Sequence, residues 1–262
     1  MMNVLTSRNN DNVKKAVKLR TDRDERTETG LFFIEGVRLC RDAVQSGIGV
    51  VSLFVTERAM GKYETEIKEI SDAARESFLI TEEISEKLSD TKSPQGVFCI
   101  CKTLDKNHNI DKINYNGIYA AFEEIQTPGN LGAAARTAEA LGLDGLIVSG
   151  GCDIYNPKAQ RAAMGSLLRL DVIRTENLPE FLMKCSEKGM KTYAAVPDKN
   201  ALPVTEIDKS GGLVAVIGNE GNGLTDKTIK ACGGRITIPM RGRAESLNAG
   251  AAASIIMWEM VR

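Results

Sequence analysis

The chain has 262 residues, of which 42% are hydrophobic and 26% are charged. These proportions are typical of a globular protein, and the length allows one large domain or two smaller ones, each with its own core. A net charge of -1 excludes a strongly basic protein that binds nucleic acid through its overall charge, although it is compatible with a local basic face.

The cysteine and histidine pattern argues against a metal site and against a histidine-based catalytic triad. The six cysteines form no C-x-x-C pair, and Cys99 and Cys101 have the alternating spacing of a strand. The one histidine, His108, lies in a polar stretch. We therefore predict reduced, structural cysteines and no metal. The polar N-terminal segment and the absence of an apolar run approaching roughly 20 residues predict a cytoplasmic protein without a membrane span.

The first hundred residues alternate between helical and strand-like patterns. Helices are predicted at 12–19, 37–47, 62–75 and 82–88, and strands at 30–36, 50–57, 78–81 and 96–102. This order predicts a small α/β domain over residues 1–104. The polar, asparagine-rich stretch that follows predicts an inter-domain linker at residues 105–116.

A second α/β pattern begins at residue 117 and predicts a domain over residues 117–262. Strands are predicted at 117–123, 143–150, 171–174, 190–197, 212–218 and 235–240, and helices up to Leu141 and at 157–168, 178–188, 226–231 and 246–261. Strands that alternate with helices indicate a mostly parallel sheet with helices on both faces.

The stretch GNEGNGLT, at 218–225, follows the apolar run GLVAVI and nearly fits a phosphate-binding P-loop. Leu224 replaces the lysine of that motif, and Glu220 adds a carboxylate, so the loop is poorly suited to a triphosphate. The order of its glycines also differs from a dinucleotide-binding G-x-G-x-x-G. Backbone groups here could bind an uncharged adenine, because glycines allow a ligand to approach closely. Glu220 could equally be a helix-start residue favoured by the helix dipole.

Two further segments carry candidate functional residues. In TPGNLGAAARTAEALG, Asn130 is placed to cap a helix in which Arg136 is the only cation. In ITIPMRGRAESLNAGAAASI, a strand stops at Pro239, a basic loop follows, and Ser246 or a near neighbour caps the last helix. Ordinary structural roles are open for all of them: Arg136 as a solvated surface arginine, and Ser246 and Asn248 as capping residues alone.

Together, the segments NLGAAARTAEALG, IGNEGNGL and IPMRGRAESLNAGAAASI resemble the motif set of the SpoU (TrmH) family of RNA ribose 2′-O-methyltransferases, within the SPOUT superfamily. The resemblance extends from about Gly117 to the C-terminus. Asn219 departs from it, because the family usually has serine there. The stretch RTDRDERTETGLFFIEGVRLCRDAV is similar to the substrate-binding domain often fused ahead of this catalytic domain, which resembles ribosomal RNA-binding proteins.

The resemblance implies a parallel α/β sheet with a deep trefoil knot, a homodimer formed through the C-terminal domain, and S-adenosylmethionine as cofactor. It implies a structured RNA substrate, with ribosomal RNA favoured over transfer RNA. The implied catalytic residues are Arg136, Asn130, Glu220, Ser246 and Asn248. The implied cofactor contacts are Val196, Gly218, Asn219, Gly221, Ile238, Met240, Ser246 and Leu247. The expected RNA contacts are Arg136, Arg241, Arg243, Lys18 and Arg20.

The role expected for Arg136 is electrostatic, because an arginine guanidinium keeps its proton in proteins. We expect it to pair with Glu220 and to act on the ribose hydroxyl or the adjacent phosphate. Three other functions remain open from the sequence: a catalytically silent RNA-binding protein of the same fold, a methyltransferase that acts on transfer RNA, and a small-nucleotide phosphotransferase that uses the glycine loop.

Overall fold

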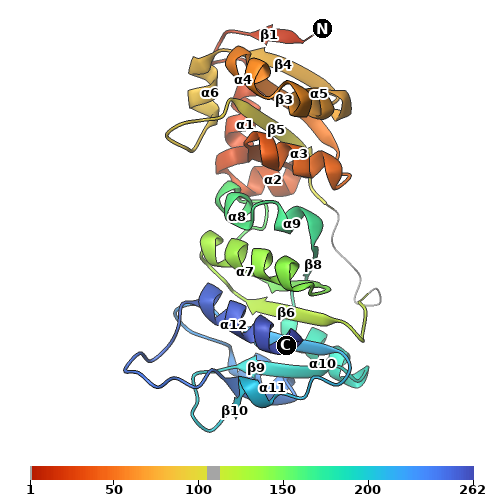
Figure 1. The fold of residues 1–262 in the computed structure, drawn as a ribbon, viewed down its shortest axis with the longest axis vertical. Coiled ribbons are helices and arrows are strands. Elements are labelled where there is room, and N and C mark those ends of the chain that lie inside the picture. The colour runs from red at the N-terminus through yellow and green to blue at the C-terminus, as the bar shows by residue number, and fades with distance from the viewer. Residues whose placement is uncertain (1, 105–112) are drawn as a thin grey trace. The chain divides into compact units, whose positions relative to one another are not determined.

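The computed structural model describes residues 2–104 and 113–262, which form two compact units (Figure 1). One unit consists of the chain up to Leu104 together with Tyr155–Leu168. The other consists of the chain between Leu104 and Tyr155 together with Arg169–Arg262. Residues 105–112 of the predicted linker, His108 among them, lie outside the described residues. Ile113, directly after them, is buried in the core of the second unit.

The first unit contains a five-stranded mixed sheet. Its strands lie in the order β1 (Asn3–Leu5), β4 (Glu76–Ile80), β3 (Val50–Thr56), β5 (Val97–Lys102) and β2 (Leu31–Glu35). Its helices before residue 104 are α1 (Asp11–Thr21), α2 (Arg23–Thr29), α3 (Val37–Gln45), α4 (Glu57–Lys62), α5 (Glu64–Ala73) and α6 (Glu82–Leu88). Strand β5 is antiparallel to both β2 and β3, while the other pairings are parallel. The predicted α/β class is confirmed, although β1, α2 and α4 were not predicted.

Aromatic and aliphatic side chains form the core beneath α1. Val13, Ala16 and Leu19 recur every third residue, so they share one helical face and pack against the sheet. The sheet residues of this cluster lie at alternate positions of their strands, which places them on one face: Phe33, Phe54, Phe78, Ile80, Phe98 and Ile100. Burial of these apolar surfaces holds α1 against the sheet.

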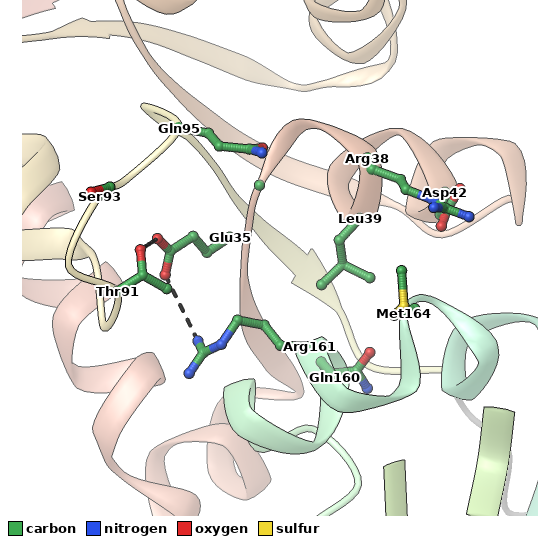
Figure 2. Close-up of a pocket in the computed structure, with 11 residues that line it drawn as sticks. Glu35, Arg38, Leu39, Asp42, Thr91, Ser93, Gln95, Gln160, Arg161 and Met164 are labelled. Carbon is green, nitrogen blue, oxygen red and sulfur yellow. Dashed lines mark hydrogen bonds and ion pairs between the residues drawn. The ribbon is translucent and has the colours of Figure 1, made fainter. Parts of the chain in front are cut away.

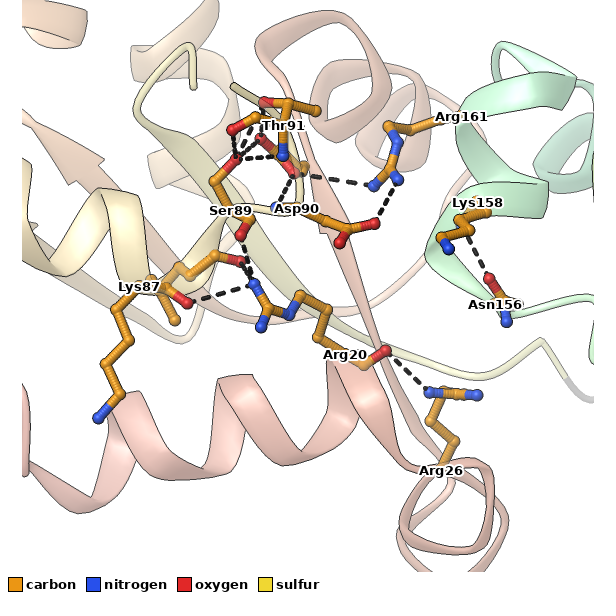
Figure 3. Close-up of polar contacts among 11 residues, drawn as sticks. Arg20, Arg26, Lys87, Ser89, Asp90, Thr91, Asn156, Lys158 and Arg161 are labelled. Carbon is orange, nitrogen blue, oxygen red and sulfur yellow. Dashed lines mark hydrogen bonds and ion pairs between the residues drawn. The ribbon is translucent and has the colours of Figure 1, made fainter. Parts of the chain in front are cut away.

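Two arginines close the ends of helices in the first unit (Figure 3). The Arg20 guanidinium donates to the carbonyl oxygens of Lys87, Leu88 and Ser89 at 3.2, 3.0 and 2.5 Å, where α6 ends. Arg26 is only 4% exposed and donates to the carbonyl oxygen of Leu19, in the last turn of α1, at 2.6 Å. The terminal carbonyls of a helix lack partners within it, so Arg20 and Arg26 have structural roles that the basic pattern of the sequence did not reveal.

The prediction of one helix at 157–168 was wrong, because two shorter helices cover this stretch. Helix α8 covers Pro157–Ala163 and α9 covers Ser166–Arg169. Between them Met164 has a φ of +50° and Gly165 a φ of +89°, and this left-handed backbone ends the first helix. The ring of Tyr155, just before α8, packs on Phe32 of β2 with centroids 4.7 Å apart.

The second unit contains a seven-stranded sheet in which every pairing is parallel, as predicted. Its strands lie in the order β10 (Leu202–Pro203), β12 (Gly234–Thr237), β9 (Lys191–Ala195), β11 (Leu213–Ile217), β6 (Ile118–Glu123), β7 (Gly145–Ser149) and β8 (Asp171–Arg174). A short 3-10 helix, η2, covers Val204–Glu206. The trefoil knot stays a prediction.

Helices cover both faces of this sheet. Helix α10 (Leu178–Glu187) packs Phe181 and Leu182 into a cluster with alternate strand residues such as Tyr119 and Val214. Helix α11 (Asp226–Ala231) contacts α10. Helices α7 (Pro128–Leu141) and α12 (Ala249–Val261) lie side by side (Figure 1), and α12 contacts β6 and β11. Small residues line both helices, which allows this close packing.

Within the described residues, no helix combines the length and the apolar character that a membrane crossing requires. The same residues contain no group of three or more His, Cys, Asp or Glu side chains arranged to hold a metal ion. None of the six cysteines forms a disulfide, and Cys40, Cys99, Cys101 and Cys185 are buried.

Replacement of Arg20 by alanine should destabilise the first unit by about 1–3 kcal/mol, because the carbonyl groups at the end of α6 lose a charged donor. Urea unfolding followed by circular dichroism measures this loss. Lys15→Ala is the matched control, since Lys15 lies exposed on the same helix. Equal stability of the Arg20→Ala and Lys15→Ala variants would contradict the capping role.

Candidate active site

The three motif segments meet at one edge of the second sheet. Strands β6 and β11 are neighbours, with Phe122 opposite Ile217 near their carboxyl ends. From β6 the chain continues to β7 and β8 on one side, whereas β9 and β12 lie on the other side of β11. Such a reversal of strand order leaves a crevice beyond the carboxyl ends, which is the usual ligand position in open α/β sheets.

A chain of hydrogen bonds joins these three segments through side chains predicted for the site. Glu220, in the turn after β11, accepts from the Asn130 side-chain nitrogen at 2.8 Å. The Asn130 side-chain oxygen in turn accepts from the Asn248 side-chain nitrogen at 3.0 Å. Asn248 then accepts from the backbone N–H groups of Gly250 and Ala251, at the start of α12. The turn, α7 and α12 are thereby fixed to one another.

The Glu220 carboxylate also fastens the backbone that leads into α7. Its two oxygens accept from the N–H groups of Gln126 at 2.9 Å and Thr127 at 3.0 Å. Desolvation acts to raise the pKa of Glu220, but hydrogen bonds from Gln126, Asn130, its own N–H and Thr127 outweigh it and lower the pKa to about 2. The group is therefore a carboxylate at neutral pH, surrounded by donors.

The turn 218–225 is folded on itself. Asn219 and Gly223 exchange backbone hydrogen bonds of 3.1 and 3.0 Å, and the Asn219 side-chain oxygen accepts from the N–H groups of Gly221 and Asn222. Gly223 has a φ of +68°, which favours glycine. A Cβ added to Gly218 would lie 2.2 Å from the carbonyl carbon of Gly223, so only glycine fits this close backbone approach.

These contacts decide against a phosphate cradle. A P-loop binds phosphate with free backbone N–H groups and a lysine. In this turn the N–H groups of Asn219, Gly221, Asn222 and Gly223 are already hydrogen-bonded within the turn. With Leu224 in the lysine position and the Glu220 carboxylate nearby, the turn suits an uncharged ligand group better than a phosphate.

Glu123 is a buried site residue that the sequence reasoning missed. At the end of β6 it is 8% exposed, and its carboxylate accepts from the Thr225 N–H at 2.8 Å, the Thr225 hydroxyl at 2.9 Å and the Thr228 hydroxyl at 2.5 Å. The next residue, Glu124, has a φ of +53° and accepts from the Asn219 side-chain nitrogen with its carbonyl oxygen. The pair therefore anchors both ends of the turn. A polar residue that ends an apolar strand was the available signal.

The predicted cap of α7 was wrong. The helix begins at Pro128, with Thr127 as its cap, and Asn130 lies inside the first turn. Proline fits the first helical position because it lacks an N–H group, and this moves the helix start forward. At the other helix, the prediction of Ser246 or a near neighbour as the cap is confirmed, because Asn248 caps α12, which begins at Ala249.

Arg136 is exposed on α7 and forms no ion pair within residues 2–104 and 113–262. The expected pair with Glu220 is therefore not formed there. Six residues of helix advance about 9 Å and rotate a side chain by about 240°, so Arg136 points away from the direction of Asn130, which binds Glu220.

The remaining predicted residues make no direct hydrogen bond to Glu220, Asn130 or Asn248 among the described residues. Val196 and Ile238 are half-buried, and the Val196 N–H donates to the carbonyl of Ile236 at 2.9 Å. The loop between β12 and α12 is exposed and contains Met240, Arg241, Arg243, Ser246 and Leu247. Lys18 and Arg20 belong to the first unit, where Lys18 pairs with Glu25.

The chain matches two family models. Residues 117–258 match the SpoU rRNA Methylase family, and residues 10–99 match the MRM3-like substrate binding domain. The chain belongs to the SpoU rRNA methylase family. Its resemblance to that family in the sequence is thereby confirmed, and the matched region contains the Glu220, Asn130 and Asn248 chain.

Two curated relatives of this chain are 23S rRNA 2′-O-methyltransferases. The 23S rRNA (guanosine(2553)-2′-O)-methyltransferase RlmP of Bacillus subtilis is 31% identical over 99% of both chains. The 23S rRNA (uridine(2479)-2′-O)-methyltransferase of Streptomyces viridochromogenes is 29% identical over 92% of this chain and 86% of its own. The AdoMet-bound rRNA methyltransferase from Sinorhizobium meliloti has a TM-score of 0.88 and 27% identity, covering 99% and 97% of the two chains.

Glu220→Gln should lose stability at neutral pH, because glutamine offers one acceptor oxygen to three N–H donors and turns an NH₂ group toward them. The lowered pKa of Glu220 makes its contribution complete above its ordinary value of 4.5 and removes it as the pH falls toward about 2. Urea unfolding across this range should show the two proteins converging at low pH. A constant difference down to about pH 2 would contradict the assignment.

Proposed function

We propose that this protein transfers a methyl group from S-adenosylmethionine to a ribose 2′-hydroxyl of structured RNA, with ribosomal RNA as the substrate class. The observation that carries the proposal is the hydrogen-bonded chain of Glu220, Asn130 and Asn248, which joins all three family motifs at the crevice. The 23S rRNA enzymes among the relatives favour ribosomal over transfer RNA. A cytoplasmic setting accords with that substrate.

The crevice fits the adenosyl group of the cofactor. The turn offers no free run of N–H groups and no lysine, as expected for an adenosine that carries no phosphate. The residues proposed to hold the cofactor are Val196, Gly218, Asn219, Gly221, Ile238, Met240, Ser246 and Leu247. When bound, S-adenosylmethionine supplies an electrophilic methyl group on a sulfonium. A similar protein, the SpoU methyltransferase AviRb, was crystallised in complex with AdoMet at a TM-score of 0.84 and 27% identity.

The polar residues of the crevice then orient the reacting ribose. The Glu220 chain holds the turn and the starts of α7 and α12 in fixed positions. This keeps the bound cofactor and the ribose aligned with each other. Arg136 supplies a permanent positive charge that favours the developing oxyanion or grips the neighbouring phosphate. Its exposed position leaves the guanidinium accessible to RNA. Ser246, in the exposed loop, completes the proposed catalytic set.

RNA contacts outside the reacting centre are assigned to Arg241 and Arg243. Both lie in the exposed loop that precedes α12, and neither forms an ion pair among the described residues. Lys18 and Arg20 are already engaged by Glu25 and by the end of α6, so they are poorer candidates for phosphate contacts. Exposed, unpaired arginines on a motif loop can neutralise phosphates without breaking an existing bond.

Complementation tests the proposed function directly. Ribose methylation is mapped across total RNA from cells that lack the protein and from cells that express wild type, Arg136→Ala or Arg174→Ala. We expect one ribosomal signal to be absent without the protein and restored by wild type and by Arg174→Ala, whose arginine is exposed elsewhere on the same unit. Arg136→Ala should reduce the rate about 100-fold or more while cofactor affinity, measured by calorimetry, stays near normal.

The other outcomes of this experiment separate the competing functions. A signal lost from transfer RNA would identify that RNA as the substrate. No lost signal, together with RNA binding, would indicate a catalytically silent RNA-binding protein. Full activity of Arg136→Ala would remove Arg136 from the catalytic set.

We also propose a homodimer formed through the second unit, on the face of α12. Ala251, Ile255 and Trp258 lie at i, i+4 and i+7 and form one stripe, in which Ile255 is 39% and Trp258 53% exposed. Helix α7, beside α12, exposes Ala133, Arg136 and Ala140, which lie at i, i+3 and i+7 and so also share one helical face. A large exposed apolar stripe favours association, and Arg136 would then lie next to the interface.

Trp258→Glu should convert the dimer to a monomer, because a carboxylate would be buried without a partner in the interface. Light scattering after size-exclusion chromatography measures the mass, with Trp258→Phe as the control that preserves an aromatic side chain. A wild-type monomer, or a Trp258→Glu dimer, would contradict this interface.

A further inference from the structure

A cavity of about 390 Å³ lies within the first compact unit (Figure 2). It opens where the turn between β2 and α3, the loop 91–95 and helix α8 meet. Its buried lining residues include Glu35, Leu39 and Gln160, whereas Arg38, Ser93 and Met164 are exposed at its rim. This volume lies within the range of small-ligand pockets, and none of the roles assigned above uses it.

The polar floor of the cavity is rigidly held. The Glu35 carboxylate, 7% exposed, accepts from the Ser89 hydroxyl at 2.5 Å, the Thr91 hydroxyl at 2.9 Å and the Asp90 N–H at 3.3 Å. Arg161 of α8 pairs with Asp90 at 2.8 Å and lies 3.8 Å from Glu35. The loop and α8 are therefore fastened to the end of β2, so the cavity has a fixed shape.

The charges around the cavity disfavour an anionic ligand. Two guanidinium groups, Arg38 and Arg161, face three carboxylates, Glu35, Asp42 and Asp90. Asp42 lies one turn after Arg38 on α3, and both carboxylates near Arg161 are within 4 Å of it. An incoming phosphate would meet excess negative charge, because three carboxylates surround two guanidinium groups and Arg161 already pairs with Asp90. The site is therefore better matched to an uncharged group.

The other lining groups suit a flat, polar ring. Gln160, 1% exposed, and Gln95 carry carboxamides; the Gln95 oxygen accepts from the Val37 N–H at 3.0 Å, and its NH₂ group is a donor of the kind that matches the edge of a base. Leu39 and the Met164 thioether provide apolar surface, and sulfur makes favourable contacts with aromatic rings. Met164 also holds a left-handed backbone, with a φ of +50°, a strained conformation that is often found at ligand sites.

We propose that this cavity receives one unstacked nucleobase of the RNA substrate. The inference rests on the proposed function, since it takes RNA as the ligand of this protein. The model of a substrate-binding domain matches residues 10–99, which include the lining residues from β2, α3 and the loop. Proteins read RNA sequence mostly from unpaired bases that are splayed out of the strand and hydrogen-bonded at their edges. The cavity would thereby recognise one nucleotide of the RNA substrate.

A variant that fills the cavity tests the proposal. Ser93→Tyr places a ring at the rim without removing any of the Glu35 or Arg161 bonds, and Thr65→Tyr adds the same ring at an exposed position on α5. With total ribosomal RNA from cells that lack the protein, Ser93→Tyr should raise the KM for RNA at least about tenfold, the value of one lost base contact. The kcat and the cofactor affinity should not change, and Thr65→Tyr should behave as wild type. A KM within twofold of wild type would overturn the proposal.

Crosslinking separates this inference from the proposed function. A photoreactive diazirine side chain at position 164 should crosslink one unpaired nucleotide of the same RNA, and Ser93→Tyr should abolish the crosslink. If wild type transferred no methyl group, the proposed function would fail. The crosslink and filter binding would still show whether the cavity binds a nucleobase of the RNA. Crosslinks that survive Ser93→Tyr, or that map to duplex RNA, would overturn it. Loss of the crosslink in submillimolar free nucleoside would assign the pocket to a free nucleoside instead.

Discussion

The carboxylate of Glu220 is the interaction on which the candidate site depends. It gathers donors from the entry of α7 and from Asn130, and through Asn130 it reaches Asn248 at the start of α12. A neutral side chain of the same shape could not accept all three N–H groups, so the negative charge is a structural requirement as well as an electrostatic one. The glycine turn holds this carboxylate in place. Glu123 in turn holds the glycine turn, because its carboxylate accepts from the Thr225 N–H.

The two units have different roles in the proposed reaction: the second contains the candidate reaction site, and the first is proposed to recognise RNA. The second unit has a reversal of strand order, with the Glu220 turn at the carboxyl ends of the strands and the exposed Arg136 on α7. The first unit uses several of its basic side chains internally, for helix ends and ion pairs, and its cavity is surrounded by more carboxylates than guanidinium groups. RNA recognition in this unit is therefore argued from base contacts more than from attraction to phosphates.

Much of the fold was predictable from the sequence, because the apolar periods of strands and helices are local properties. The parallel sheet of the second unit followed from its alternating pattern. Short elements such as β1 and β10 were missed, since their pairing with distant strands rather than their own composition makes them strands. The break at Met164 was missed because a left-handed methionine is set by tertiary contacts and not by propensity.

The site was predictable in composition but less so in geometry. The family motifs identified Asn130, Glu220 and Asn248. Which of these side chains bond to one another depended on the residues at which the helices begin. Proline at the start of α7 moved Asn130 from the cap position to the helix interior, where it could bridge Glu220 and Asn248. The roles of Arg20 and Arg26 were not visible as patterns either, because the carbonyl groups that they cap are distant in the chain or hidden by the fold.

The sequence separation of the Glu220 contacts has a consequence for how the protein acquires its site. Glu220 binds partners 90 to 94 positions earlier in the chain, and Asn130 and Asn248 are 118 positions apart. Contacts with such high sequence separation form late, after the entropy of closing long loops has been offset by pairing of β6 with β11. A nascent or partly folded chain therefore lacks the cofactor site altogether. Binding of the cofactor would then select completely folded molecules and stabilise them by mass action.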